Sequence, residues 1–285
     1  MSKGPAKTII DITKGFAKHQ YICSEEISTA IYLANELDKP ILIEGPPGVG
    51  KTELANTAAL YYKKALLRLQ CYEGLDETKA LYEWRYGKQL LYTQILKEQM
   101  QEVLEGAKGL KDSLDRLMEF EDIFFSEQFL ESRPLLQSLT SEEGNVLLID
   151  EVDKADEEFE ALLLEILSEF QVSIPELGVK KAQVKPLVIL TSNNSREIGD
   201  ALKRRCLHLY IPFPDAKLER DIIKARVPEV SKKLQVQLVN FVQGLRELDL
   251  KKLPAISETI DWAKTLILLN ADELNQELAK NTLNV

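Results

Sequence analysis

The feature that most constrains this chain is the segment from Gly45 to Thr52, which fits the pattern Gly-x-x-x-x-Gly-Lys-Thr. An apolar run, 41–44, precedes it, and a stretch rich in alanine and leucine, 51–64, follows it. Glycines let backbone N–H groups converge on phosphate oxygens, and the start of the following helix adds the positive end of its dipole. The pattern therefore predicts a strand, a phosphate-binding loop and a helix in that order.

Each residue of this loop is a candidate ligand of a bound nucleotide. The side chain of Lys51 is long enough to reach the β- and γ-phosphates, and the Thr52 hydroxyl is a candidate ligand of Mg²⁺. The full candidate set in this segment is Gly45, Pro46, Pro47, Gly48, Val49, Gly50, Lys51, Thr52 and Glu53. A chance match to a Gly/Pro turn is the alternative, and the flanking strand and helix disfavour it.

A second signal is the apolar run 146–149, which ends in Asp150 and Glu151. Next to a phosphate loop, Asp150 is placed to hold Mg²⁺ and Glu151 to polarise an attacking water. An acidic pair after a buried strand is also common in ordinary strand-to-loop turns. Because the same chain has a phosphate loop, we favour the functional interpretation over an ordinary strand-to-loop turn.

Two further signals follow later strands. Asn193 comes after the apolar run 187–190 and is placed to orient a water, although strand-to-loop turns favour asparagine in any case. Arg204 and Arg205 precede the last apolar run, and either could reach the γ-phosphate of a neighbouring subunit. The alternative for the arginines is a solvated basic edge.

Five apolar runs alternate with helical stretches, which predicts a parallel α/β sheet. The predicted strands are 41–44, 65–70, 145–150, 186–191 and 207–211.

The C-terminal part of the chain has no further strand signal. We therefore predict a nucleotide-binding core over residues 1–214 and a small helical lid domain over 215–285. Within the core, residues of about 72–135 form a polar amphipathic stretch that is predicted to be a mostly helical insertion.

Composition narrows the class of protein. The net charge of −10 gives no diffuse attraction to nucleic acid or to an anionic membrane. Three cysteines and two histidines exclude a disulfide framework and a His-rich zinc site. The N-terminus has no apolar signal segment, and no apolar run is long enough to cross a bilayer. We expect a cytoplasmic protein without a membrane partner.

In this order, the motifs resemble those of AAA+ ATPases, and within them of the MoxR branch. The segments that carry this resemblance are 21–26, 40–54 and 163–165 ahead of the short strand 172–174. The run 69–76, together with 81–84, is similar to the CoxD-type subgroup, which is associated with maturation of molybdenum enzymes like carbon monoxide dehydrogenase. The resemblance implies an α/β fold of three α/β/α layers with a five-stranded parallel sheet and a helical lid, and the cofactors ATP and Mg²⁺.

The resemblance also implies roles for single residues. Asp150 and Glu151 match the metal-holding and water-activating pair, and Asn193 matches the residue called sensor 1. Arg205 matches the arginine finger, with Arg204 in reserve.

Two places are left open by the resemblance. Tyr21 and Ile22 lie where the family packs the adenine, or they belong to the core. The sensor 2 arginine of the family has Glu258 in its place, and a carboxylate does not favour a γ-phosphate. Either another lid residue such as Lys264 substitutes, or lid closure is coupled differently.

The partners implied are further copies of the chain in a ring, expected to be a hexamer, a separate protein with a von Willebrand A domain, and a client metalloenzyme. The aromatic residues of the insertion are either partner contacts or packing residues, namely Tyr72, Trp84, Tyr86 and Tyr92. A chelatase-type motor that inserts Mg²⁺ into a tetrapyrrole is one alternative. A nucleic-acid motor is another, although residues 173–185 offer it only Lys180, Lys181 and Lys185. A regulatory module that binds nucleotide without hydrolysis is the third.

Overall fold

The centre of the molecule is a five-stranded sheet in the order β2-β5-β8-β1-β9, and every pairing in it is parallel. The computed structural model describes residues 8–94, 126–175 and 177–282. The five strands are β1 (Ile41–Glu44), β2 (Ala65–Gln70), β5 (Asn145–Asp150), β8 (Leu187–Ser192) and β9 (Leu207–Tyr210). The predicted α/β fold class is confirmed.

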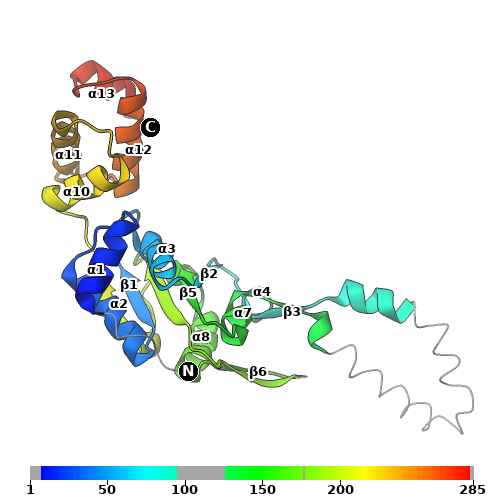
Figure 1. Ribbon diagram of the computed structural model, residues 1–285. Helices are drawn as coiled ribbons and strands as arrows, with labels where there is room; N and C mark the ends of the chain where they lie inside the picture. The colour runs from blue at the N-terminus through cyan, green and yellow to red at the C-terminus, as the bar shows by residue number, and fades with distance from the viewer. Residues whose placement is uncertain (1–7, 95–125, 176, 283–285) are drawn as a thin grey trace, which may run out of the picture.

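Helices cover both faces of this sheet (Figure 1). One face packs against α1 (Ile9–Lys18), α2 (Glu25–Leu37) and α3 (Lys51–Tyr62). The other face packs against α7 (Pro134–Thr140), α8 (Glu157–Glu169) and α9 (Asp200–Arg205).

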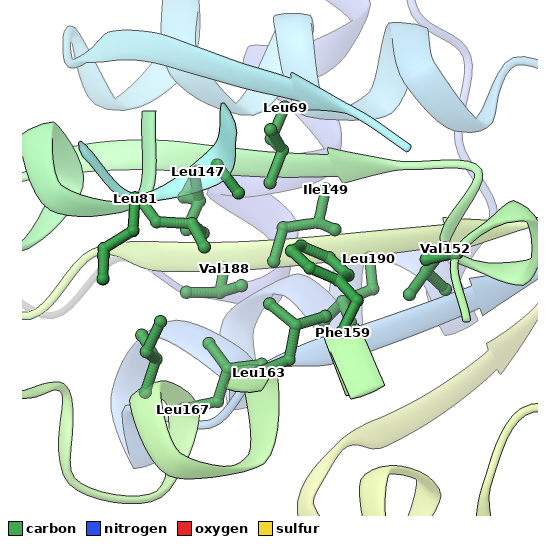
Figure 2. Packing of buried hydrophobic residues seen from close by; sticks show 14 of the residues in the cluster. Leu69, Leu81, Leu147, Ile149, Val152, Phe159, Leu163, Leu167, Val188 and Leu190 are labelled. Atoms are coloured by element: carbon green, nitrogen blue, oxygen red, sulfur yellow. The ribbon is translucent and has the colours of Figure 1, made fainter. Parts of the chain in front are cut away.

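Alternation along the buried strands decides which residue meets which helix layer. Leu147 and Ile149 of β5 join the cluster under α8, whereas Val146 and Leu148 face the layer of α1 to α3. Figure 2 shows the α8 side, where Phe159 of the helix points at the strand residues. Burial on both faces explains why these strands are unbroken apolar runs in the sequence.

Polar side chains cap the first turns of two helices beside the sheet. Helix α2 begins at Glu25, because the Ser24 hydroxyl accepts a hydrogen bond from the N–H of Ile27. Helix α8 begins at Glu157, because the Asp156 carboxylate caps the N–H of Phe159.

The prediction of a mostly helical insertion is wrong for part of the region. It contains α4 (Glu77–Ala80), η1 (Glu127–Phe129) and an antiparallel pair of β3 (Tyr82–Trp84) with β4 (Leu130–Ser132). Residues 86–94 are helical, and 95–125 lie outside the described residues. The two strands come from segments far apart in the chain, so local periodicity does not reveal their pairing. An ion pair of Arg133 and Glu83 at 2.6 Å also joins the two segments.

The aromatic residues of this region divide between packing and solvent. Trp84 is buried and meets the ring of Tyr82 edge-on. Tyr92 meets Phe129 edge-on at 5.3 Å between ring centroids. Tyr72 and Tyr86 are exposed, so of the four candidate contact residues Trp84 is the one whose side chain belongs to the core.

The remaining short elements lie at the ends of the sheet. The hairpin of β6 (Gln171–Ile174) and β7 (Gly178–Lys181) follows α8, and η2 (Val152–Lys154) follows β5.

The C-terminal helices form a separate hydrophobic cluster, and Figure 1 shows them to one side of the sheet. They are α10 (Ala216–Arg226), α11 (Lys232–Arg246), α12 (Ile256–Leu268) and α13 (Gln276–Thr282). The position of the domain boundary, between residues 214 and 215, stays a prediction. Among the described residues, no helix is both long and apolar enough to cross a membrane.

Candidate functional site

A cavity of about 410 Å³ lies where the phosphate loop, the carboxyl ends of the strands and the C-terminal helices meet. Most of the predicted nucleotide and catalytic residues line it: Tyr21, Ile22, Pro47, Gly48, Val49, Gly50, Lys51, Thr52, Glu53, Asp150, Glu151 and Asn193. Gly45 and Pro46 do not line the cavity but bind Lys51 through their carbonyl oxygens. Arg204 and Arg205 lie elsewhere.

The loop is confined between two other segments, which explains two of its glycines. A Cβ on Gly45 would lie 2.2 Å from the carbonyl oxygen of Ile211, beyond the end of β9. A Cβ on Gly48 would lie 2.3 Å from the Cβ of Ala255, at the start of α12, and the φ of Gly48 is +74°. Neither position accepts a side chain without displacement of the neighbour. The phosphate loop is therefore in direct contact with the C-terminal helices.

Lys51 is buried, and its ammonium group is fully hydrogen-bonded. Nζ donates to the carbonyl oxygens of Gly45 and Pro46 at 2.6 and 2.7 Å and to Oδ1 of Asn193 at 2.7 Å. Burial lowers the pKa of Lys51 to about 8, and the nearby negative charges only partly oppose this shift. All three donors bond to neutral oxygens, which a phosphate can replace.

The Asp150 carboxylate is also buried and accepts hydrogen bonds from three side chains. The hydroxyls of Thr52 and Thr191 donate to Oδ1 at 3.1 and 2.5 Å, and Nη2 of Arg68 donates to Oδ2 at 2.6 Å. A carboxylate beside a hydroxyl is a donor set that suits Mg²⁺, which prefers hard oxygen ligands. Among the described residues there is no cluster of three or more His, Cys, Asp or Glu residues for a metal. The arrangement fits an ion that is held mainly by one carboxylate and by the phosphates of its nucleotide.

Glu151 lies in the left-handed region, at φ 57°, where β5 turns into η2. Its N–H donates to the Thr191 hydroxyl at 2.9 Å. Its carboxylate accepts from Nδ2 of Asn193 at 3.2 Å and from Nε2 of Gln70 at 2.9 Å, and it pairs with Lys154 at 2.5 Å. The same contact with Glu151 raises the pKa of Lys154. A water that bonds to Glu151 would therefore exchange with one of these donors.

Asn193 connects the two predicted catalytic groups, because its amide accepts from Lys51 and donates to Glu151. Its own N–H donates to Asp153 at 3.2 Å. Burial acts to raise the pKa of Asp153, but hydrogen bonds from the hydroxyl and N–H of Ser195 and from the N–H of Asn193 outweigh it and lower the pKa. The ionised Asp153 thus fixes the loop that presents Asn193.

The apolar part of the cavity can accept a flat base. It is lined by Tyr21 and Ile22 from the core and by Leu218 and Ile222 from α10, among others. Burial raises the pKa of the Tyr21 phenol, which stays neutral. The placement of adenine here stays a prediction.

The two candidate finger arginines are exposed on α9. Nε of Arg205 donates to the Ser168 hydroxyl at 2.7 Å. Arg204 forms no side-chain hydrogen bond or ion pair with the residues that the structure describes. Neither arginine lines the cavity of its own chain.

Neither of the two lid residues considered for the sensor 2 position lines the cavity. Glu258 is turned away from the cavity, where its carboxylate accepts from the N–H of Ala255 at 2.9 Å and from Lys252 at 2.6 Å. Lys264 pairs with Asp261 and also lies outside the cavity. The lid cation that lines the cavity is Arg226, among the described residues.

Sequence reasoning missed Arg226 and the two polar residues of β2, Arg68 and Gln70. The signal for the β2 residues is their alternation at the carboxyl end of a strand that pairs with β5. The signal for Arg226 is its spacing of four and eight residues from Ile222 and Leu218, which places all three on one face of α10.

Solved structures show the same fold. RuvB of Thermotoga maritima in a mutant form is 16% identical, with a TM-score of 0.54 over 98% of this chain and 72% of RuvB. A structure described as the Thermotoga maritima RuvB Holliday junction branch migration motor is 17% identical, with a TM-score of 0.50 over 98% of this chain and 71% of that one.

Two relatives by sequence come from staphylococci. An uncharacterized protein of Staphylococcus haemolyticus is 26% identical over 261 residues, which is 89% of this chain and 85% of the relative. An uncharacterized protein of Staphylococcus aureus strain USA300 is 24% identical over 219 residues, 75% of this chain and 70% of the relative.

The family model of the AAA domain, dynein-related subfamily, matches residues 40–206, which is more than half of the chain and contains the phosphate loop, β5, Asn193 and both candidate finger arginines. The chain belongs to this AAA domain family and is an AAA+ ATPase.

Proposed function

We propose that this ATPase hydrolyses ATP at the interfaces between copies of itself in a ring and uses the energy to remodel a client protein. The observation that carries the proposal is the convergence of Lys51, Asp150, Glu151 and Asn193 on one cavity that lacks both candidate finger arginines. The cavity has the residues that bind the nucleotide and activate water, and in this proposal the finger arginine comes from a neighbouring copy.

In this proposal, Lys51 and the loop N–H groups bind the phosphates, while Thr52 and Asp150 hold Mg²⁺. The ion supplies positive charge next to the phosphates when it is bound. Glu151 orients and polarises the attacking water, with Asn193 as its positioning partner. The nucleotide-binding core is residues 1–214, and the lid is residues 215–285.

The support for a ring is the exposed position of the two candidate finger arginines. Arg205, with Arg204 in reserve, is exposed at the end of α9, and it would exchange its bond to Ser168 for a phosphate of a neighbouring copy, where an arginine stabilises the charge of the transition state. A hexamer is the stoichiometry that we propose. Three free cysteines suit a reducing cytoplasm, which we propose as the location.

For the client, we propose a role as a MoxR-type chaperone of the CoxD-like kind, which activates a molybdenum hydroxylase together with a von Willebrand A domain protein. The support is the resemblance of the run 69–76 to the CoxD-type subgroup; in the structure, Gln70 of this run bonds to Glu151 and Cys71 is buried. A chelatase-type motor is the alternative that shares the same catalytic parts.

A nucleic-acid motor has less support, although one structural neighbour is described as a branch migration motor. The lysines that such a motor would offer on the β6–β7 side each have an acidic partner: Lys180 pairs with Glu127, Lys181 with Glu169, and Lys185 with Asp38. The net charge of −10 adds repulsion from a phosphate backbone.

The experiment replaces Glu151 with Gln. Glu151→Gln should keep ATP binding and lower turnover by about 100-fold or more, as expected for loss of a general base. Glu157→Gln, on the exposed start of α8, is the matched control and should hydrolyse ATP normally. Unchanged turnover in Glu151→Gln would contradict the assignment, and affinity capture with this trapped variant would name the client.

The interface is tested with the arginines. Arg205→Ala should assemble normally, as measured by light scattering, and should not hydrolyse ATP. If Arg204→Ala alone abolishes turnover, the finger is Arg204. If neither variant loses turnover, hydrolysis does not take place at a subunit interface of this kind.

A further inference from the structure

An ion pair joins the C-terminal helices to the phosphate-binding helix at the edge of the cavity. Arg226, the last residue of α10, places Nη2 2.9 Å from Oε1 of Glu53 on α3. Nδ2 of Asn56 donates to the other oxygen of the Glu53 carboxylate at 3.2 Å. Arg226 and Glu53 both line the cavity.

The position of Glu53 is unfavourable for an anion-binding site. It is the third residue of α3, directly after Thr52, in the helical turn whose N–H groups face the phosphate loop. A carboxylate beside a bound polyphosphate repels it, because both are negative and the cavity is partly shielded from water. Some positive charge must offset Glu53 before a nucleotide binds tightly here.

Arg226 supplies that charge. Helix α10 presents Leu218, Ile222 and Arg226 to the cavity at a spacing of four residues, so apolar side chains meet one part and a guanidinium the other. Of the lid cations that the structure describes, Lys264 pairs with Asp261 outside the cavity, and Arg226 alone lines it.

The ion pair with Glu53 leaves Arg226 able to bind a second anion. Both side chains are about one-third exposed, and ion pairs of this exposure are weak. A guanidinium has five donors in a planar fork that fits phosphate oxygens as well as a carboxylate. Arg226 can therefore bind a phosphate while it stays beside Glu53.

We propose that Arg226 is a nucleotide-contacting residue of the lid, which offsets Glu53, binds a phosphate group of the nucleotide, and so makes the position of the lid depend on nucleotide charge. This inference rests on the proposed function of the cavity as an ATP site. In this inference, Arg226 on the first lid helix, α10, provides the positive charge that is missing at the position of Glu258 on α12.

The experiment measures the affinities of ATP and ADP for the full chain by calorimetry, with three variants and a control. Arg226→Gln should weaken ATP binding about tenfold. Glu53→Gln should leave ATP affinity unchanged or raise it, because a repulsive charge is lost. The double variant should recover part of the loss of Arg226→Gln. Lys224→Gln removes the same charge from an exposed position of α10 and should bind ATP as the wild type does.

A purely structural latch gives a different pattern. If the ion pair only holds the lid in place, Arg226→Gln and Glu53→Gln weaken binding equally and the double variant is no worse than either, which would overturn the proposal. ATP affinity that is unchanged in Arg226→Gln also overturns it.

Lys51→Ala separates this inference from the function on which it rests. If Lys51→Ala abolishes ATP binding while Arg226→Gln has no effect, the nucleotide site stands and only the role of Arg226 fails. If the wild type does not bind ATP, or binds it independently of Lys51, both fail.

Discussion

The buried ion pair of Glu219 and Arg246 should be the most sensitive point of the C-terminal helices. The guanidinium binds the carboxylate through two parallel contacts, at 2.7 and 2.8 Å, and the residues are 0% and 6% exposed. Thr259 and Gln243 donate to the same carboxylate. The substitution Arg246→Met keeps an unbranched chain in place of the apolar stem of arginine but leaves Glu219 buried with two neutral donors and no countercharge.

The expected loss is large because the remaining charge cannot reach water. Removal of one partner of a buried pair costs about 3–5 kcal/mol. A further hydrogen bond, from Nε of Arg246 to the carbonyl oxygen of Pro254, is lost with it. Replacement of both partners, Glu219→Leu with Arg246→Met, removes the uncompensated charge and should therefore cost less than Arg246→Met alone.

Fluorescence can follow these helices separately. The chain has two tryptophans, and Trp262 is buried in α12, so a Trp84→Phe background reports on the C-terminal cluster. For an m value of about 2 kcal/mol/M, Arg246→Met should lower the urea midpoint by roughly 2 M. Lys217→Met, at an exposed position of α10, is the control. A midpoint lowered by less than about 0.5 M, or a double variant that is less stable than Arg246→Met, would refute the reasoning.

The phosphate loop and Asp150 give three further expectations. Lys51 has a pKa of about 8, and a bound phosphate favours its charged form, so ATP binding at pH 8.5 should take up about 0.8 proton. Calorimetry in buffers of different ionisation enthalpy measures this uptake, and its absence would contradict the reasoning. Gly48→Ala should weaken ATP binding, and Ala255→Gly should restore only part of it, because the clash is relieved and the positive φ is not. Arg68→Ala removes a cation that competes for Asp150, so the Mg²⁺ concentration for half-maximal ATPase activity should fall; a rise would refute the competition.

The sequence located the five sheet strands to within one residue at each end, for a physical reason. Strands buried on both faces are continuous apolar runs, and glycine, proline or asparagine interrupts the chain around them, as in β1 and β5. The order of the strands in the sheet does not follow from such runs, because the neighbours β2 and β5 are separated by the whole insertion.

The residues that meet in the cavity divide in the same way. Asp150 ends β5, Asn193 follows β8 and Lys51 follows β1, and these three strands are consecutive in the sheet, so the convergence is predictable once the order of the strands is known. Arg226 reaches the cavity only through packing of the C-terminal helices against the phosphate loop. Gln70 is a polar residue that the sequence alone would place in solvent. The positions of both side chains depend on contacts between distant elements, and hydrophobic periodicity does not predict such contacts.

The charges around the cavity explain how an acidic chain holds a polyphosphate. Three carboxylates that line the cavity each have a cationic partner within 3 Å: Arg226 with Glu53, Arg68 with Asp150, and Lys154 with Glu151. Lys51, by contrast, bonds to two carbonyl oxygens and one amide oxygen among the described residues, and its pKa is low because burial lacks a direct countercharge. Lys51 is therefore a positive charge of the site that is not bonded to a carboxylate. It lies beside the N–H groups of the phosphate loop. The net charge of −10 does not oppose binding there, because the carboxylates nearest to the phosphates are already paired.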